Sequence, residues 1–293
     1  MSDELRIDER PVLRRPILVA AFAGWNDGGS AATLAVEHLA SVWGAEHFAD
    51  IDPEGFFDFQ SVRPTVALED GVTRRIDWPE TTFRAGTIPG GDRDVVLLSG
   101  VEPNYRWRAF CGLVTGLARE LQVELVVTLG ALLADVPHTR AAPVTGAASD
   151  PSLVEELGLK LSRYEGPTGI VGVLHDACRH ADLPSVSLWS AVPHYVSLSP
   201  SPKGARALCE KLAEVVGVPV DVEALSSVEE DYTRQVTQAV SSDHETHAYV
   251  EELERRADTI EIFSEGGELP TGESLAEELS RFLREREATD PPA

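Results

Sequence analysis

A segment near the N-terminus joins an apolar run to an amphipathic run through a glycine-rich turn. Residues 17–23 are all apolar, the turn reads Gly-Trp-Asn-Asp-Gly-Gly, and apolar residues recur at helical spacing over 32–43. Gly44 stands where glycine commonly ends a helix. This pattern predicts a strand, a tight turn and a helix, which together form the first unit of a parallel α/β sheet.

Strand-like and helix-like runs then alternate along much of the chain. The further strands that we predict are 56–60, 65–69, 72–78, 94–99, 124–129, 169–174 and 185–191. Asp70-Gly71 predicts a hairpin, because both central positions of a type I′ turn need positive φ. Helices are predicted around the apolar stripe that begins at Phe110 and over 202–216.

The pattern predicts an α/β fold with a mixed, mostly parallel sheet in a core domain over 15–220, with a β-hairpin insertion near 56–88. A helical C-terminal extension is expected over 221–285, with helices near 221–240 and 244–258 and a last one that begins at a Ser274–Glu277 capping box. The ends, 1–14 and 286–293, are expected to be flexible.

Composition limits the classes of partner. With 293 residues, 43% of them hydrophobic, the chain can bury a large core. Its formal net charge of −24 argues against binding nucleic acid or an anionic membrane, because both need a basic surface. The longest apolar run, 125–134, is too short to cross a bilayer. No membrane partner is therefore expected.

The cysteines and the N-terminus indicate a cytoplasmic protein. Cys111, Cys178 and Cys209 are odd in number and unclustered, so we expect buried thiols rather than disulfides or a metal site. The first sixteen residues are charged throughout, without the apolar stretch of a secretory signal.

Three polar loops leave the carboxyl ends of predicted strands, where ligands bind in open α/β sheets. They span 24–29, 100–104 and 130–140. We expect their polar groups and glycines to converge on one strand-end crevice, the candidate ligand site: Gly24, Asn26, Asp27, Gly28, Glu102, Asn104, Asp135, His138 and Arg140.

Each group in this crevice also has a structural interpretation. The turn at 24–29 follows neither glycine-rich phosphate motif, and Asp27 would repel an anion, so an N-cap is the plainer interpretation. Asp27 and Glu102 are also an acid–base pair in principle, although nothing in the sequence fixes their separation. No metal-ligand spacing, nucleophile elbow or paired Cys–His motif is present. We therefore assign no catalytic residue, metal or cofactor.

Several segments, taken together and in order, carry a resemblance to a known family. They are GWNDGGSAA, GVEPNYRW, LGALLADVPHTRAAPV, EGPTGIVGVL, SLWSAVPHYV and LPTGESLAEELSRFLRE. With this order and spacing over about 15–285, the chain resembles the proteasome assembly chaperone 2 family, in its actinobacterial branch.

The resemblance implies a three-layer α/β/α sandwich like that of nucleoside phosphorylases and related hydrolases, with an appended helical region. It also implies homo-oligomers, trimers among them, and proteasome subunits as partners. Relatives often carry a C-terminal hydrophobic-Tyr-any residue tail that docks on the proteasome ring. This chain ends in 288–293 without one, so tail-dependent docking is not expected here.

Two functional hypotheses follow. The first is a non-enzymatic, homo-oligomeric interaction protein that resembles proteasome assembly chaperones. The alternative is a small-molecule-binding protein or enzyme, phosphorylase- or hydrolase-like, that takes a nucleoside or phosphorylated ligand in the strand-end crevice. That alternative rests on analogy between folds.

Overall fold

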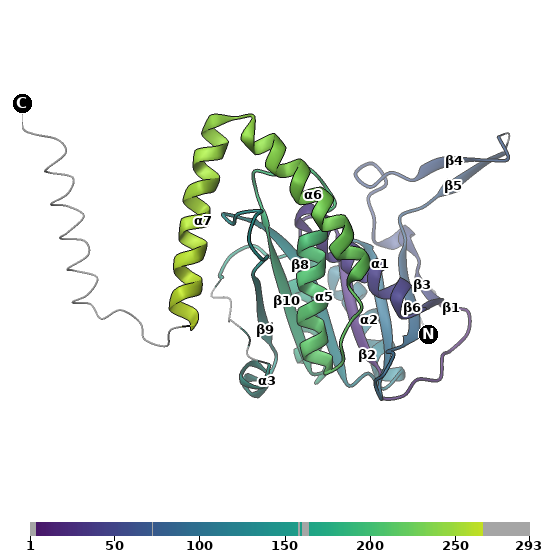
Figure 1. Cartoon of the computed structure of the whole chain (residues 1–293). Helices are drawn as coiled ribbons and strands as arrows, with labels where there is room; N and C mark the ends of the chain where they lie inside the picture. Colours follow the sequence, from purple (N-terminus) through teal and green to yellow (C-terminus); the bar gives the residue numbers. More distant parts are fainter. Residues whose placement is uncertain (1–3, 72, 158, 160–163, 266–293) are drawn as a thin grey trace, which may run out of the picture.

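The computed structural model describes residues 4–71, 73–157, 159 and 164–265. One eight-stranded sheet forms its centre (Figure 1). Four neighbouring strands run parallel, in the order β7 (Asp94–Val101), β2 (Ile17–Ala23), β8 (Leu125–Ala134) and β10 (Ser185–Pro193). Because these strands are covered on both faces, they are apolar almost throughout.

Antiparallel strands extend the sheet on both sides. On one side β7 is followed by β6 (Thr81–Thr87), β3 (Glu46–Ile51) and β1 (Leu5–Ile7). On the other side β10 pairs with β9 (Val144–Ala148). The mixed sheet agrees with the sequence prediction, which also expected it to be mostly parallel. Among the described strands of this sheet, three pairings are parallel and four are antiparallel.

Helices cover both faces and complete the three layers. Helices α1 (Ala31–Val42) and α5 (Pro202–Val216) pack on one face. The other face is covered by α2 (Trp107–Glu120) and α4 (Ile170–His180). The short helix α3 (Pro151–Glu156) follows β9. The expected α/β fold is thereby confirmed.

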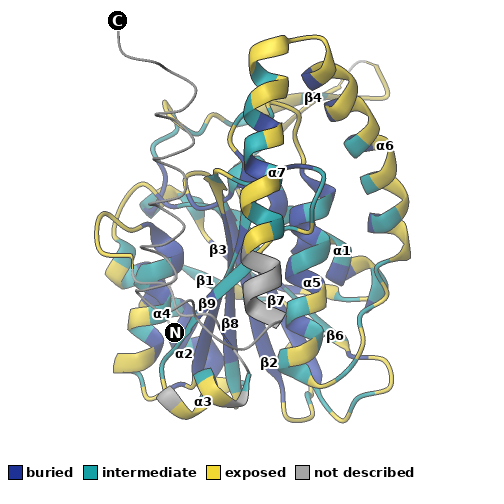
Figure 2. Cartoon of the chain, turned by 60° about the vertical axis from the view of Figure 1, so that its left-hand side comes forward, coloured by how far each residue is buried: buried dark blue, intermediate teal, exposed yellow. Residues whose placement is uncertain are grey.

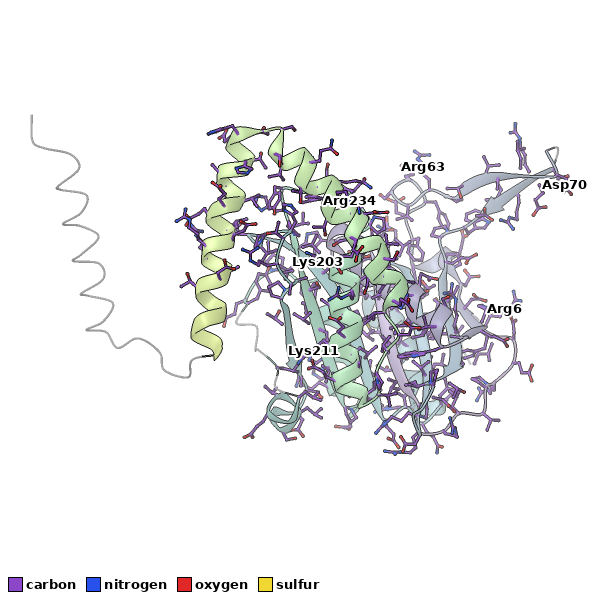
Figure 3. The ribbon with its side chains drawn as sticks, in the orientation of Figure 1. Arg6, Arg63, Asp70, Lys203, Lys211 and Arg234 are labelled. Carbon is purple, nitrogen blue, oxygen red and sulfur yellow. The ribbon has the colours of Figure 1, made fainter. Side chains whose placement is uncertain are left out.

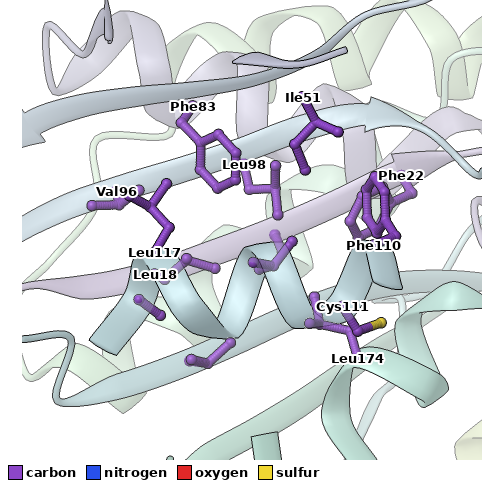
Figure 4. Packing of buried hydrophobic residues seen from close by; sticks show 14 of the residues in the cluster. Leu18, Phe22, Ile51, Phe83, Val96, Leu98, Phe110, Cys111, Leu117 and Leu174 are labelled. Carbon is purple, nitrogen blue, oxygen red and sulfur yellow. The ribbon is translucent and has the colours of Figure 1, made fainter. Parts of the chain in front are cut away.

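The core beneath α2 and α4 is built on aromatic contacts (Figure 4). Phe110 on α2 makes edge-to-face contacts with Phe22 of β2, at 5.8 Å between ring centroids, and with Phe56, at 5.5 Å. All three rings are fully buried. Such pairs add about 0.5–1.5 kcal/mol each to the burial of their surface, so they fix the end of β2 beside α2.

The C-terminal region forms a helical hairpin, α6 (Glu223–Ser241) and α7 (His244–Glu265). Helix α6 packs against α5 of its own chain, and its residue Leu225 joins the core beneath α1 and α5. Much of the outer surface of both helices is exposed (Figure 2). Within the described ranges, no helix is long and apolar enough to cross a membrane.

A separate two-stranded ribbon projects from the molecule (Figure 1). It consists of β4 (Thr65–Glu69) and β5 (Thr73–Asp77), and we call residues 65–77 the arm. Asp70 and Gly71 at its tip have φ of 51° and 72°, as the predicted hairpin turn requires. Of the insertion expected near 56–88, β6 instead belongs to the main sheet.

Three sequence predictions are wrong in detail. Residues 169–174 begin α4 instead of forming a strand, since a short apolar run alone does not distinguish the two. Residues 56–60 form turns in which Phe56 and Phe57 donate to the Pro53 carbonyl, and no strand. Residues 5–7, within the segment expected to be flexible, form the edge strand β1. The helix predicted after Ser274 and the tail 286–293 lie outside the described residues.

Candidate functional site

The glycine-rich turn after β2 places Asp27 at the start of α1. Its carboxylate accepts from the Ala32 backbone N–H at 2.7 Å, and from the Thr33 N–H and hydroxyl at 3.3 and 2.5 Å. Burial raises the pKa of Asp27, although these hydrogen bonds oppose the shift. The Asp27 carboxylate therefore caps the first turn of α1, although the N-cap position itself is Ser30 and not the Asn or Asp of the turn.

Asn26 and Glu102 form a second pair of bonded side chains at the strand ends. The Asn26 amide donates to Glu102 Oε1 at 2.7 Å, and the same oxygen accepts from the Ile170 backbone N–H at 2.8 Å. Glu102 thus caps α4. Asn26 is 1% exposed, and its Oδ1 has no hydrogen-bond partner among the described residues.

Three glycines permit close packing at these strand ends. A Cβ at Gly169 would lie 2.1 Å from Asn26 Nδ2 and 2.5 Å from Glu102 Oε1, so only glycine fits there. Gly24 has a φ of 131°, which favours glycine, and approaches Glu102. Gly28 lies against the backbone of β8 at 131–133.

His138 lies under α6 and is 2% exposed. The Tyr195 hydroxyl accepts from the His138 backbone N–H at 2.8 Å and lies 2.9 Å from Nδ1, while Nε2 lies 3.0 Å from Thr237 Oγ1. A neutral ring protonated at Nε2 satisfies this network. Burial, followed by the Lys203 ammonium, lowers the pKa of His138, against the opposite effect of Glu254.

Polar contacts between the loop after β8 and α7 form what we call the clasp. Arg140 makes a bidentate ion pair with Asp258, at 2.7 and 3.1 Å, and its Nη1 lies 3.7 Å from Glu254. The clasp also contains Thr139, which donates to Glu254, and Asp135, which accepts from Tyr249 at 3.1 Å. Residues 135–140 therefore hold the helical hairpin on the core.

Lys203 on α5 reinforces the same junction. Its ammonium donates to the backbone carbonyls of His138 and Arg140 and lies 3.7 Å from Glu229 of α6 (Figure 3). Burial lowers the pKa of Lys203 although Glu229 opposes the shift. A cavity of about 10 Å³ beside His138 and Lys203 has room for at most one water.

The residues proposed for one crevice thus divide into separate groups. Asn26, Glu102 and Gly24 lie together at α4, with Asp27 and Gly28 turned toward α1 and β8. Asp135, His138 and Arg140 contact α6 and α7 instead. Asn104 accepts from the Asp58 backbone N–H at 2.8 Å, at the loop before the arm.

Several important partners are not identifiable from the sequence. Thr33 lies six residues after Asp27, beyond the three-residue spacing of a capping box, so no capping pattern indicates it. Gly169, Thr237 and Lys203 carry no local signal, because each meets its partner only across the fold.

The other candidate chemical groups are structural or exposed. Cys111, Cys178 and Cys209 are buried free thiols, and burial raises the pKa of each to about 12. They are therefore protonated and unreactive at neutral pH. Asp8, His47 and Asp50 lie close enough to share a cation, but they are partly exposed and His47 already contacts both carboxylates.

These features define an α/β/α sandwich protein whose strand-end polar groups are engaged in internal contacts. Residues 21–240 match the PAC2 family, and the chain belongs to that family. No curated protein matches it.

Solved structures resemble this chain over most of its length. A proteasome-assembly chaperone homologue of Mycobacterium tuberculosis is 48% identical, with a TM-score of 0.74, over 80% of this chain and 99% of that one. A PAC2 family protein of Streptomyces avermitilis is also 48% identical, with a TM-score of 0.75 and the same coverage. An archaeal proteasome activator of Pyrococcus furiosus shares the fold at 17% identity, with a TM-score of 0.66 over 80% and 97% of the two chains.

Proposed function

We propose that this protein is a non-enzymatic, homo-oligomeric interaction protein of chaperone type that binds proteasome subunits in the cytoplasm. The observation that carries the proposal is that the polar groups at the strand ends form hydrogen bonds and ion pairs within the protein. Asp27 and Glu102 cap helices, and His138 and Arg140 hold the helical hairpin. A catalytic crevice would need such groups free to reach a substrate.

Family membership supports the choice of partner. The PAC2 match spans 21–240, and a relative at 48% identity is described as a proteasome-assembly chaperone homologue. A chaperone needs surface for protein contacts, and α6, α7 and the arm provide a large exposed area (Figure 2).

The small-molecule alternative has less support. A phosphorylated ligand would bind where helix N-termini meet the strand ends. In this chain the Asp27 carboxylate already occupies the N-terminus of α1, and the Glu102 carboxylate that of α4. Both carboxylates would repel a phosphate, so this edge of the sheet favours a structural role.

The proposal is tested by the rate of proteasome assembly. Purified α and β subunits from the same organism are mixed with and without the protein, and half-proteasomes and full particles are followed by native gel over time. We expect faster accumulation of correctly sized particles when the protein is present at stoichiometric amounts. An unchanged time course, with an equal amount of serum albumin as control, would contradict the proposal.

A further inference from the structure

The arm has one apolar face that is largely exposed in the part of the chain that the structure describes. Val66, Leu68 and Ile76 share this face and are 58%, 64% and 50% exposed. The opposite face is charged, with Arg75 held between Glu69 and Asp77. An isolated two-stranded ribbon is marginally stable in water, so an apolar face of this kind favours cover by another surface.

An exposed arginine lies on the same face. Arg74 stands directly opposite Leu68 in the ribbon and is exposed. It forms no ion pair within the described ranges, although the chain carries 49 acidic residues against 25 basic ones. The face therefore combines three apolar side chains with one available guanidinium.

A groove of complementary character lies at the root of the arm. Its volume is about 580 Å³, and it is lined by Trp78 and Pro53 together with carboxylates that include Glu54 and Glu80. One cation, Arg6, also lines it and pairs with Asp8, so carboxylates outnumber cations in the lining. Both glutamates are exposed, and neither has an ion pair with any residue that the structure describes. Thr81 also lines the groove, and its buried hydroxyl has no described hydrogen-bond partner.

The arm of a chain cannot fill the groove of the same chain. The groove lies where the arm leaves the body, whereas Leu68 and Arg74 lie toward the tip, beside Asp70 (Figure 3). Five residues per strand carry the tip about 17 Å outward. The arm projects away from the sheet and its root (Figure 1). The complementary surfaces can therefore meet only between two copies.

We propose that the arm of one copy docks by its Val66–Leu68–Ile76 face in the groove of a second copy, where Arg74 meets Glu54 and Glu80. The inference rests on the homo-oligomer of the proposed function and supplies its interface. Because arm and groove are different surfaces, the contact is head-to-tail, and repeated contacts close into a ring when the rotation allows it.

The first test compares arm variants of the full chain by sedimentation velocity at micromolar concentration. Leu68→Asp places a charge in the contact and should leave single chains, with the dissociation constant raised at least about tenfold. Thr73→Asp is the matched control, since it adds the same charge to the charged face of the arm. It should leave the oligomer unchanged. A wild-type protein that sediments as a single chain would overturn the proposal.

The second test asks whether the contact is head-to-tail, with the arm of one copy in the groove of the next. Glu54→Arg with Glu80→Arg disables the groove and should also give single chains. Mixed with Leu68→Asp, this variant still offers an intact arm, and its partner still offers an intact groove. Native mass spectrometry should then detect a one-to-one pair that grows no further. A mixture that stays as single chains would contradict a head-to-tail contact.

A third test exchanges the charges of the arm and the groove within one chain. Arg74→Glu alone should weaken the oligomer, and its combination with Glu54→Arg and Glu80→Arg should restore it. The mass of the oligomer is measured without any proteasome subunit. Loss of the arm–groove interface and loss of proteasome binding are therefore observed independently of each other. Loss of subunit binding by Leu68→Asp with an unchanged oligomer would assign the arm to another protein and overturn the inference.

Discussion

Two helices of the core are capped at their N-termini by side-chain carboxylates of residues outside the helix. Asp27 caps α1 from five and six residues away, and Glu102 caps α4 from 68 residues away. Each carboxylate satisfies backbone N–H groups that would otherwise be unpaired. At the scale of single residues, Asp27 and Glu102 of the predicted ligand crevice thus stabilise the helices that cover the sheet.

Asp27→Ala should lower the free energy of unfolding by about 1–2 kcal/mol, because it removes the cap of α1. Asp27→Asn keeps an acceptor oxygen at the same place and should lose less. Urea denaturation of the two variants measures the difference. Equal losses would mean that the carboxylate is not a cap.

Gly169→Ala should destabilise the protein by about 1–3 kcal/mol, since the new methyl group would overlap Asn26 and Glu102. Gly112→Ala on α2 is the matched control. A Cβ there meets nothing within 4 Å, and alanine should stabilise the helix by about 0.5–1 kcal/mol. Thermal unfolding of both variants checks the opposite signs. A destabilised control or an unaffected Gly169→Ala would contradict the described packing.

His138 should make stability fall as the solution becomes mildly acidic. Its pKa is lowered in the folded state, so below the ordinary value near 6.5 the unfolded chain binds a proton that the folded chain does not. Burial also lowers the pKa of His175, which acts in the same direction. The stabilisation is therefore present above that pH and lost below it.

His138→Gln should flatten the dependence of the unfolding free energy on pH between about 7.5 and 5.5, leaving the share of His175. His244→Gln, an exposed substitution at the start of α7, is the control. Identical slopes for the wild type and His138→Gln would show that His138 is not held neutral.

Sequence reasoning could identify the cap at Asp27, because its partners follow within two turns of chain. It could not identify the role of Glu102, whose partner Ile170 comes near only through the pairing of β2, β7 and β8. For the same reason His138 and Arg140 looked like crevice residues. Their partners lie on helices 99 and 118 residues further along.

At the scale of secondary-structure elements, the clasp determines how firmly α7 is held. Among residues 244–259 of α7, whose burial the structure describes, the buried apolar residues are Val250 and Leu253, so polar contacts carry much of the attachment of this helix. Arg140→Ala should raise the rate of amide hydrogen exchange along α7 about two- to fivefold, equivalent to a loss of roughly 0.5–1 kcal/mol.

Arg256→Ala is the matched control for the clasp, because Arg256 pairs only with Glu252 on its own helix among the contacts described. Hydrogen exchange with mass spectrometry should place the change in α7 and leave the central strands unaffected. Uniform acceleration across the sheet would mean that Arg140 supports the core rather than the hairpin.

The elements themselves were predictable where their pattern was long. The first strand and helix, the arm turn and the helices α5, α6 and α7 follow the sequence. Residues 169–174 did not, because their apolar, β-branched run suits a strand equally well. In the fold they begin a helix whose first N–H group donates to Glu102. Strands β3 and β6 are about half polar, and β9 is short and contains a glycine, so no local signal indicated them.

At the scale of the whole molecule, the polar groups at the strand ends contact the rest of the fold, whereas much of the described surface of α6, α7 and the arm is exposed. The helical hairpin lies across α5, and the arm projects from the opposite end of the sheet (Figure 1). With a net charge of −24, the body favours partner surfaces that carry basic residues. This arrangement suits a protein that binds other proteins.

Native mass spectrometry of the purified protein with proteasome α subunits, and separately with β subunits, tests the central claim most directly. We predict complexes of defined stoichiometry with α subunits, retained in the Asp27→Asn variant because that carboxylate serves the fold. No complex with either subunit, together with a small non-covalent mass carried by the protein and lost in Asp27→Asn, would contradict the account and favour a ligand in the strand-end crevice.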